Sequence, residues 1–416
     1  MKSEVNGSID MKVYILPKIA VILLAIYVLE GYMLTNANPL LGLSILMLTI
    51  HILSRKNVEI SIKKSHMLWI SFSIVLIAGS SLSVNINEGL KFGFYIFGLV
   101  VTMIILSNSN NWQNSFYKAV WFFSLIHVVA TLLAFAFPYW ISGVSSFLLN
   151  SVDFELNQYF IFQYGGNPGI TGQIGLNAWF ISIFIATAFS SVITSSKRKW
   201  INSLLLFLAL FALLLANKRG LIIGNLIAIL VISSSLGFFN KKALKRIIPT
   251  LFLISGLIGV IIAYVPEAQV VINRFNQTSN FLTGRESIYQ DMFTYFSENP
   301  ILGVGTFSIV KLVGEAGHNV YLQVLAENGL LGFLLLMSAI VVSLLNTFRN
   351  LYYLRKNENR KKKKVLIFSL YIQILFIIYS LSGNPLYNYQ FISIYLFAIS
   401  TEISVINKKT IAKSEA

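Results

Sequence analysis

Long uninterrupted runs of apolar residues are the feature that most constrains the fold of this chain. Each run has about 15–22 residues, and a helix of that length, rising 1.5 Å per residue, crosses the hydrocarbon core of a bilayer. We place such runs at residues 17–35, 39–53, 67–84, 89–106, 116–137, 172–193, 200–217, 220–237, 248–264, 319–346, 365–383 and 389–406. Only 12% of the 416 residues are charged, too few for the surface of a soluble protein. The pattern predicts an all-α polytopic membrane protein with about twelve spans. It excludes a β-barrel, whose strands would alternate.

Lys and Arg residues are distributed unevenly between the segments that connect these spans. With the N-terminus inside, the inner segments hold 24 of the 32 basic residues. These inner segments are 1–16, 54–66, 107–115, 194–199, 238–247, 347–364 and 407–416. The outer segments 36–38, 85–88, 138–171 and 384–388 hold none. Because cytoplasmic loops retain Lys and Arg, we predict that both termini are cytoplasmic. The net charge of +16 then reflects membrane orientation rather than nucleic-acid binding.

Two further features concern anchoring in the membrane. The apolar run from Ile19 to Leu29 ends at Glu30 without a small-residue cleavage site, which favours a retained first span over a cleaved signal peptide. The basic cluster Arg360–Lys364 precedes a span on the predicted cytoplasmic side. We interpret this cluster as an orientation anchor that contacts anionic lipid.

Five basic residues are predicted on the outer side, where positive charge is otherwise avoided: Lys218, Arg219, Arg274, Arg285 and Lys311. Arg274 and Lys311 fit solvated loop positions. Lys218 and Arg219 lie between two apolar runs, and a charge at the bilayer centre costs about 2.5–3.5 kcal/mol, less near the surface. These two residues either reach the lipid headgroups or form an anion-binding clamp at the outer mouth of a cavity.

The outer loop 138–171 ends in a stretch rich in Gly and Asn that leads into the sixth span. Gly and Pro permit irregular backbone, which membranes tolerate where protein or water surrounds it. Gln173 and Asn177 are four residues apart and are predicted to share one helix face as the span begins. The alternative is an ordinary junction between a loop and a helix.

The longest polar stretch of the chain, Thr283 to Gly332, closes the large outer loop 265–318 and enters the tenth span. Thr283 and Glu286 have the spacing of a capping box, so we expect an amphipathic helix from there to Asn299-Pro300, lying at the outer membrane interface. Gly303-Val304-Gly305 is interpreted as a flexible turn. A lone Gly-x-Gly outside a βαβ unit does not indicate a nucleotide site.

His318 and Asn319 begin the tenth span, whose helix is expected to continue through Glu327, Gly329 and Gly332. Glu327 follows His318 by nine residues, about 13.5 Å along an unbroken helix, so it is not a direct partner of the imidazole. Glu327 either ties helices together or stays protonated in the bilayer.

Several of these motifs, taken in order, resemble the hallmark region of the O-antigen ligase and O-antigen polymerase family. An Arg opens a loop helix (Arg285), a Pro-x-x-Gly-x-Gly turn follows (300–305), then His-Asn-x-Tyr-Leu (318–322) and Glu-x-Gly-Leu-Leu-Gly (327–332). Residues 217–220 resemble the family's Ser-Arg-Gly-type element, although Asn and Lys replace its small hydroxyl residues. Residues 169–178 resemble an element of Gram-positive members, with Gln173 where His is expected.

The resemblance implies a membrane glycosyltransferase of the bacterial cytoplasmic membrane with its active site on the outer face. The donor would be a glycan on undecaprenyl diphosphate. The acceptor would be a sugar hydroxyl on another lipid-linked glycan, on lipid A core, or on a protein. The family is held to invert the anomeric carbon without a metal or other cofactor. A chain-length regulator and a flippase would be partners in the membrane.

Residue roles follow from the charge that develops on the departing diphosphate. Arg219 and Arg285 are the candidates to stabilise it, since guanidinium binds phosphate through two hydrogen bonds and stays charged. His318 is the candidate to accept the proton of the acceptor hydroxyl; the alternative is an interfacial His at a helix start. The remaining candidates are Lys218, Asn319, Tyr321, Gln173 and Asn177 for substrate contacts, and Glu286, Gly303, Gly305, Glu327 and Gly329 for structural support. We expect Arg219 to reach the same face as Arg285 and His318.

Three functional classes stay open. A polymerase of lipid-linked repeat units is favoured over a ligase or a protein oligosaccharyltransferase by the Gram-positive element and by the Lys-, Ile- and Asn-rich composition. A flippase would also have about twelve spans, but it should show internal repeats, and none is seen. A non-catalytic scaffold is the third class. The predicted organisation is spans 1–9 in residues 1–264, the catalytic loop in 265–318, and spans 10–12 with the tail in 319–416.

Overall fold

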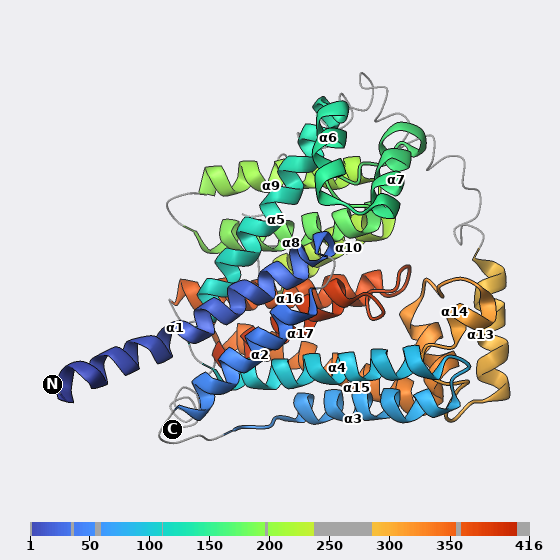
Figure 1. The fold of residues 1–416 in the computed structure, drawn as a ribbon, viewed down its shortest axis with the longest axis horizontal. Helices are drawn as coiled ribbons and strands as arrows, with labels where there is room; N and C mark the ends of the chain where they lie inside the picture. The colour runs from blue at the N-terminus through green and yellow to red at the C-terminus, as the bar shows by residue number, and fades with distance from the viewer. Residues whose placement is uncertain are drawn as a thin grey trace. The chain divides into compact units, whose positions relative to one another are not determined.

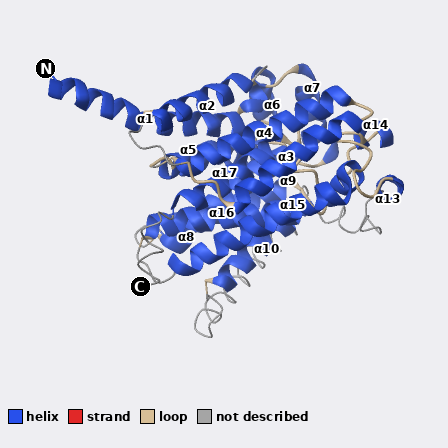
Figure 2. Ribbon diagram, turned by 90° about the horizontal axis from the view of Figure 1, so that it is seen from below, coloured by secondary structure: helices blue, strands red, loops and turns tan. Residues whose placement is uncertain are grey.

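The computed structural model describes residues 2–34, 37–54, 60–109, 111–195, 199–236, 285–354 and 359–405 (Figure 1). Within these ranges every regular element is a helix and no strand occurs, as Figure 2 shows. The predicted all-α fold is confirmed. The predicted ninth span (248–264) and the loop residues Arg274 and Thr283 lie outside the described residues.

The helices follow the predicted spans. They are α1 (Lys2–Leu29), α2 (Asn38–Leu53), α3 (Lys64–Gly79), α4 (Ile86–Asn108), α5 (Gln113–Ala136), α8 (Ile174–Thr194), α9 (Lys199–Ala216), α10 (Arg219–Ser235), α15 (Val320–Tyr353), α16 (Arg360–Tyr379) and α17 (Tyr389–Val405). Six helices are long and apolar enough to cross a membrane, and four shorter apolar helical segments accompany them within the described ranges. The chain is therefore a multi-pass membrane protein; twelve spans and their orientation stay predictions. α1 begins at Lys2, well before the expected start at residue 17.

The chain forms two compact units, which we describe separately. Unit 1 comprises Met1–Val120 and Arg285–Ala416, and unit 2 comprises Trp121–Gly284. Helix α5 begins in unit 1 and continues into unit 2. The candidate residues Arg285 and His318 belong to unit 1, whereas Lys218 and Arg219 belong to unit 2.

In unit 1, α3 packs between α4 and α15, and α17 packs against α4 and α16 (Figure 1). Aromatic side chains fill the interior of this bundle. The ring of Tyr395 in α17 stacks on Phe376 of α16 at 4.2 Å and meets Trp69 of α3 edge-on at 5.8 Å. All three side chains are fully buried. Large aromatic contacts of this kind hold membrane helices together by close packing, since lipid supplies little hydrophobic driving force.

Four connecting segments of unit 1 meet at one end of its helices, which we call the site end: residues 30–34, 80–85, 299–319 and 380–388. The amide of Thr306 donates to Gly79 (3.2 Å), and the amide of Val320 donates to Ser380 (2.9 Å). The Tyr95 hydroxyl donates to the carbonyl of Tyr389 (3.2 Å). At the opposite end, Ser61 donates its amide to Asn108 (2.8 Å).

Helices α13 (Glu286–Glu298) and α14 (Ile309–Val313) stand at the site end (Figure 1). The predicted helix before Asn299-Pro300 is confirmed, but its predicted start is wrong. Arg285 is the N-cap residue and Glu286 the first helical residue, so Glu286 does not occupy the third position that a capping box requires. Ile288 and Met292 pack with α14 and α15, so this side of α13 faces protein.

Unit 2 contains α8, α9 and α10, with α8 packed against both neighbours. The segment 138–171, expected as a loop, forms α6 (Pro138–Leu148), α7 (Ser151–Tyr159) and one π-helical turn (Phe160–Tyr164). Pro138 starts α6 at a position where its missing N–H costs nothing, and Asn150 caps α7 by accepting from Asp153 (3.0 Å). The prediction failed here because these helices are too short and too polar to read as spans.

Candidate functional site

Helix α15 is interrupted in the middle of the recognised motif. Gly329 has φ 60° and ψ −164°, a conformation open essentially to glycine alone. The expectation of a continuous helix from His318 through Gly332 is therefore wrong. The break frees carbonyl groups before Gly329 and amide groups after it, and these groups need new partners in a buried position.

The segment Pro300–Gly305 supplies those partners with its own backbone. The amides of Val304 and Gly305 donate to the carbonyls of Ala326 and Glu327, both at 2.9 Å. In return, the carbonyls of Pro300 and Ile301 accept from the amides of Leu330 (2.9 Å) and Leu331 (3.3 Å). Four backbone hydrogen bonds thus pair the two irregular segments with each other, the kind of pairing that irregular backbone in a membrane protein requires.

Glycine is required at this contact because the two backbones touch. A Cβ on Gly303 would lie 2.4 Å from the carbonyl carbon of Glu327, and one on Gly305 would lie 2.3 Å from the amide of Ser83. Both glycines have positive φ, 72° and 99°. The interpretation of Gly303-Val304-Gly305 as a flexible turn is wrong: these residues are wedged between α15 and the end of α3.

Glu327 is fully buried beside the break, and its carboxylate accepts four hydrogen bonds. Oε2 accepts from the Phe307 amide (2.9 Å) and the Tyr387 hydroxyl (2.8 Å). Oε1 accepts from the Ile309 amide (3.2 Å) and the Gln323 side chain (2.9 Å). Burial, and next the nearby Glu327 carboxylate, raise the pKa of Tyr387 well above its usual value. The phenol therefore stays protonated and donates a hydrogen bond to the carboxylate. These are the contacts of a side chain that ties three segments together.

Arg285 precedes α13 and points to the connection after α16. Its guanidinium donates through Nη1 to the carbonyl of Ser382 (3.0 Å) and lies within electrostatic range of the Tyr379 ring. The side chain is half-buried. A guanidinium has five N–H donors, and within the described part of the chain this hydrogen bond orients the group through one of them.

His318 stands in a short segment that is fixed on both sides. The preceding Gly317 donates its amide to Gln323 (3.2 Å), and the following Asn319 caps α15 by accepting from the amides of Tyr321 (3.0 Å) and Leu322 (3.1 Å). His318 itself is half-buried with φ 50°, in the left-handed region that His enters more readily than most residues. The imidazole is therefore presented from a rigid turn.

The connection 380–388 links Arg285 with the start of α15. Ser382 accepts from Arg285, while Ser380 accepts from the Val320 amide, two residues after His318. The Tyr321 hydroxyl also donates to Ile377 near the end of α16 (2.9 Å). The structure thus brings Arg285 and His318 to one region of the site end. In the part of the chain that the structure describes, no three His, Asp or Glu side chains gather as a metal-binding group.

Lys218 and Arg219 open α10 in unit 2. Asn217 takes φ 55° and reverses the chain after α9, which makes Lys218 the N-cap and Arg219 the first residue of α10. Both side chains are half-buried. A helix N-terminus favours anions through its unpaired amides. The expected pairing of Arg219 with Arg285 concerns both units and stays a prediction.

Gln173 and Asn177 do not share an environment, contrary to expectation. Gln173 is the exposed N-cap of α8, before the helix begins, whereas Asn177 is fully buried. The Asn177 amide donates to Thr131 (2.8 Å) and to the carbonyl of Asn167 (3.0 Å). Asn157, which was not selected in the sequence analysis, donates to the carbonyls of Gly169 (3.0 Å) and Thr171 (2.7 Å). Asn157 and Asn177 therefore hold the glycine-rich segment in shape.

The sequence analysis also missed the connection 380–388, whose Ser382 and Tyr387 contact Arg285 and Glu327. Ser382 acts through its backbone carbonyl, which carries no side-chain signature. The signal that was present is the polar stretch Ser-Gly-Asn-Pro between two apolar runs on the predicted outer side.

Residues 204–337 match the model of a protein family described as O-antigen ligase. The matched segment covers less than half of the chain and contains Arg219, Arg285, His318 and Glu327. It ends inside α15, beyond the break at Gly329. A search of curated proteins finds no match.

Proposed function

We propose that this chain, which belongs to the O-antigen ligase/polymerase family by the match over residues 204–337, is a polymerase of lipid-linked glycans. The family resemblance of the sequence motifs is thereby confirmed, and members of the family are membrane enzymes of the glycosyltransferase type. The proposed substrates are two glycan repeat units, each carried on undecaprenyl diphosphate at the outer face of the bacterial cytoplasmic membrane. The product is a capsule, exopolysaccharide or O-antigen chain.

The proposed reaction is a direct displacement at the anomeric carbon of the donor glycan. A hydroxyl oxygen of the acceptor glycan forms the new bond to this carbon from the opposite face, while the bond to the diphosphate oxygen breaks. Undecaprenyl diphosphate leaves with the electron pair, and the hydroxyl proton passes to a base. One bond forms and one breaks, and the anomeric configuration inverts.

Arg285 is proposed to stabilise the departing diphosphate. Its guanidinium is oriented by Ser382 at the site end and is half-buried, where a charge acts more strongly than in water. Arg219, at the N-terminus of α10, is proposed for the same role. No metal ion takes part in this proposal, because guanidinium groups supply the positive charge.

His318 is proposed as the base that accepts the proton of the acceptor hydroxyl. Imidazole is the side chain whose ordinary pKa best suits proton transfer near neutral pH. The fixed turn between Gly317 and Asn319 holds the ring in place. The observation that carries the proposed function is that Arg285 and Val320, two residues after His318, both bond to the connection 380–382.

The test uses the full-length protein in lipid vesicles with undecaprenyl-diphosphate-linked repeat units extracted from the host strain. Wild type should produce a ladder of longer glycans. Arg219→Ala and Arg285→Ala should each slow elongation by about 10²–10³-fold. His318→Ala should slow it by about 10²–10⁴-fold. Arg285→Lys should also be strongly impaired, since an ammonium cannot form the paired hydrogen bonds of the guanidinium.

Glu298→Gln, an exposed change in α13, is the matched control and should elongate normally. Full ladders from all three alanine variants would remove the site assignment. Activity lost in a chelator and restored by a divalent ion would contradict the metal-free reaction. In the host, deletion of the gene should leave single repeat units without long chains. Accumulation of lipid-linked units on the cytoplasmic face would instead indicate a flippase.

A further inference from the structure

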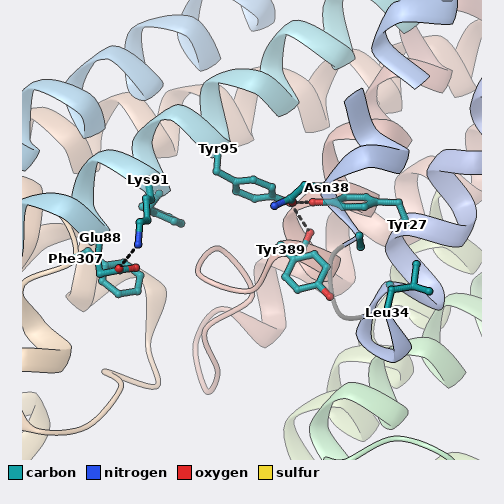
Figure 3. Close-up of a pocket in the computed structure, with 11 residues that line it drawn as sticks. Tyr27, Leu34, Asn38, Glu88, Lys91, Tyr95, Phe307 and Tyr389 are labelled. Atoms are coloured by element: carbon teal, nitrogen blue, oxygen red, sulfur yellow. Dashed lines mark hydrogen bonds and ion pairs between the residues drawn. The ribbon is translucent and has the colours of Figure 1, made fainter. Parts of the chain in front are cut away.

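A cavity of about 400 Å³ opens at the site end of unit 1 (Figure 3). Its lining comes from α1, α2, α4, the segment after Gly305, and the start of α17. None of the candidate residues selected from the sequence is among the eleven residues that line it. The volume falls in the range of about 300–1,000 Å³ that small-molecule sites occupy.

Aromatic rings form much of the wall. Tyr27, Phe92, Tyr95, Phe307 and Tyr389 all line the cavity. Phe92 lies 5.6 Å from Phe307, so α4 and the segment after Gly305 contribute to one continuous aromatic surface. Phe92 also stacks on Tyr387 at 5.0 Å with the rings nearly parallel, and Tyr387 lies 6.1 Å from Phe307, so the three rings form one cluster.

Phe307 is held in place at a conformational cost. Its φ is 64°, in the left-handed region, which is unfavourable for a bulky residue. Its amide is fixed by the Glu327 carboxylate at 2.9 Å, and the same carboxylate binds Tyr387. Strained residues of this kind persist where surrounding contacts enforce them, and they cluster at ligand sites. Glu327 therefore braces the aromatic wall that faces the cavity.

Two charged side chains, Glu88 and Lys91, also line the cavity, and their charges cancel. Lys91 and Glu88 form an ion pair at 2.7 Å, with side chains 72% and 45% exposed. The Tyr27 hydroxyl donates to the Tyr95 hydroxyl at 3.3 Å (Figure 3). The lining thus offers ammonium donors, carboxylate acceptors and hydroxyl groups beside ring faces, with no net charge.

This combination selects a class of ligand. A diphosphate would meet the Glu88 carboxylate as well as the Lys91 ammonium, so an anion gains little. A polyprenyl or acyl chain would leave the polar groups without partners, which is unfavourable. A sugar ring matches both parts, since its C–H faces pack on aromatic rings and its hydroxyls donate and accept hydrogen bonds.

We propose that this cavity is a carbohydrate-binding subsite that holds one or two sugar residues of the acceptor glycan. The inference rests on the proposed function, because it assigns the cavity to the acceptor of that reaction. The connection 380–388 joins the two places: Ser382 orients Arg285, and Tyr387 supports the aromatic wall. A glycan seated in the cavity is thereby positioned at the same end of unit 1 as His318.

The test measures binding separately from transfer. The probe is the repeat-unit oligosaccharide released from the host's surface glycan by mild acid, added to the purified full-length protein in detergent. The double variant Glu88→Gln/Lys91→Gln keeps the lining neutral and changes two exposed side chains. Phe307→Leu shortens the aromatic wall. The matched control is Lys311→Gln/Glu315→Gln, the same exchange at exposed residues of the site end outside the cavity.

The oligosaccharide should raise the unfolding midpoint of wild type, of the control and of His318→Ala. The double variant should need about tenfold more oligosaccharide for the same shift, the loss expected from one charge-assisted hydrogen bond. In vesicles its KM for the acceptor should rise by a similar factor with kcat and the donor KM unchanged. Phe307→Leu should weaken binding in the same direction.

Equal concentration dependence in wild type, the double variant and Phe307→Leu would overturn the subsite. It would also be overturned if undecaprenyl phosphate, added without sugar, stabilised the protein in a manner that these substitutions abolish, because the cavity would then bind lipid. The two proposals fail separately. Normal polymer from His318→Ala would remove the proposed base while sugar binding could still be observed, and polymerisation can be intact in a protein whose cavity binds no sugar.

Discussion

At the scale of single residues, Glu327 shows how a buried carboxylate serves structure rather than proton transfer. Its four hydrogen-bond donors come from the segment after Gly305, from α15 itself and from the connection 380–388. Two of those donors are backbone amides, which cannot reverse their polarity. Any substitution that removes an acceptor therefore leaves a buried N–H group without a partner.

We predict that Glu327→Gln destabilises the protein by about 1–3 kcal/mol, since its amide nitrogen would face a donor. Glu327→Ala should lower the free energy of unfolding further, because all four donors lose their acceptor. The measurement is the unfolding midpoint in detergent, with the exposed Glu298→Gln as control, for which a change within about 0.5 kcal/mol is expected. A Glu327→Gln protein as stable as wild type would show that the carboxylate is not the structural tie described above.

Asn319 illustrates a residue whose structural role competes with a predicted substrate contact. Its side-chain oxygen already accepts from two amides at the start of α15. Asn319→Ala should therefore lower stability by about 1 kcal/mol, whereas Asn319→Asp should retain the cap. We expect transfer activity to follow stability in both variants. A stable but inactive Asn319→Asp would assign the amide to the substrate instead.

At the scale of elements, the break in α15 explains why the Pro-x-x-Gly-x-Gly and Glu-x-Gly parts of the motif occur together. The Glu-x-Gly part contains Gly329, which breaks α15, and the Pro-x-x-Gly-x-Gly part supplies the backbone that pairs with the groups freed by the break. A Cβ on Gly329 would lie 2.2 Å from the carbonyl oxygen of Ile301. The two glycine-containing segments are halves of a single contact.

Gly303→Ala and Gly329→Ala should each prevent accumulation of folded protein, because the added carbon collides with backbone that cannot move aside. Gly314 has a similar φ of 86° but open space around its Cβ position. Gly314→Ala should lower the free energy of unfolding by only about 1–2 kcal/mol, the cost of a left-handed conformation at an alanine. This variant should still reach the membrane. Folded yield by size-exclusion chromatography compares the three. Equal yields would mean that conformation, not collision, sets the requirement for glycine.

The sequence predicted the helices well and the site geometry poorly, for a physical reason. Length and apolarity are local properties, so eleven predicted spans coincide with helices described here, although α1 begins at Lys2 rather than at residue 17. The break at Gly329 could not be predicted from hydropathy, because it depends on backbone contacts with a distant segment. Its partner segment lies some twenty-five residues earlier and acts through backbone atoms. Arg285 and His318 were selected by motif, but Ser382, whose carbonyl accepts from Arg285, was not.

At the scale of the whole molecule, the chain offers a direct test of its orientation because it contains no cysteine. Each introduced thiol is then a unique reporter. Ser81→Cys and Glu315→Cys lie at exposed positions of the site end, and Ser61→Cys lies exposed at the opposite end.

A membrane-impermeant maleimide should label Ser81→Cys and Glu315→Cys in intact cells, and Ser61→Cys only after permeabilisation. This pattern follows from the excess of Lys and Arg in the segments predicted to be inside. Labelling is read as a mass shift of the purified protein, with the cysteine-free parent as blank. The reverse pattern would place the site end in the cytoplasm and contradict an outer-face reaction.

The contacts between the end of α3 and the residues just before α14 also determine when the site end can form during biosynthesis. Thr306 donates to the carbonyl of Leu76, 230 positions earlier in the chain, and Ser308 bonds to Ser83 across 225 positions. A ribosome adds about 5–20 residues per second, so the first helices wait in the bilayer for many seconds before these partners emerge. Insertion and assembly are consequently separate stages for this protein. A nascent chain that stops after α16 would carry Arg285 and His318 and still lack Ser382, whose carbonyl accepts from Arg285.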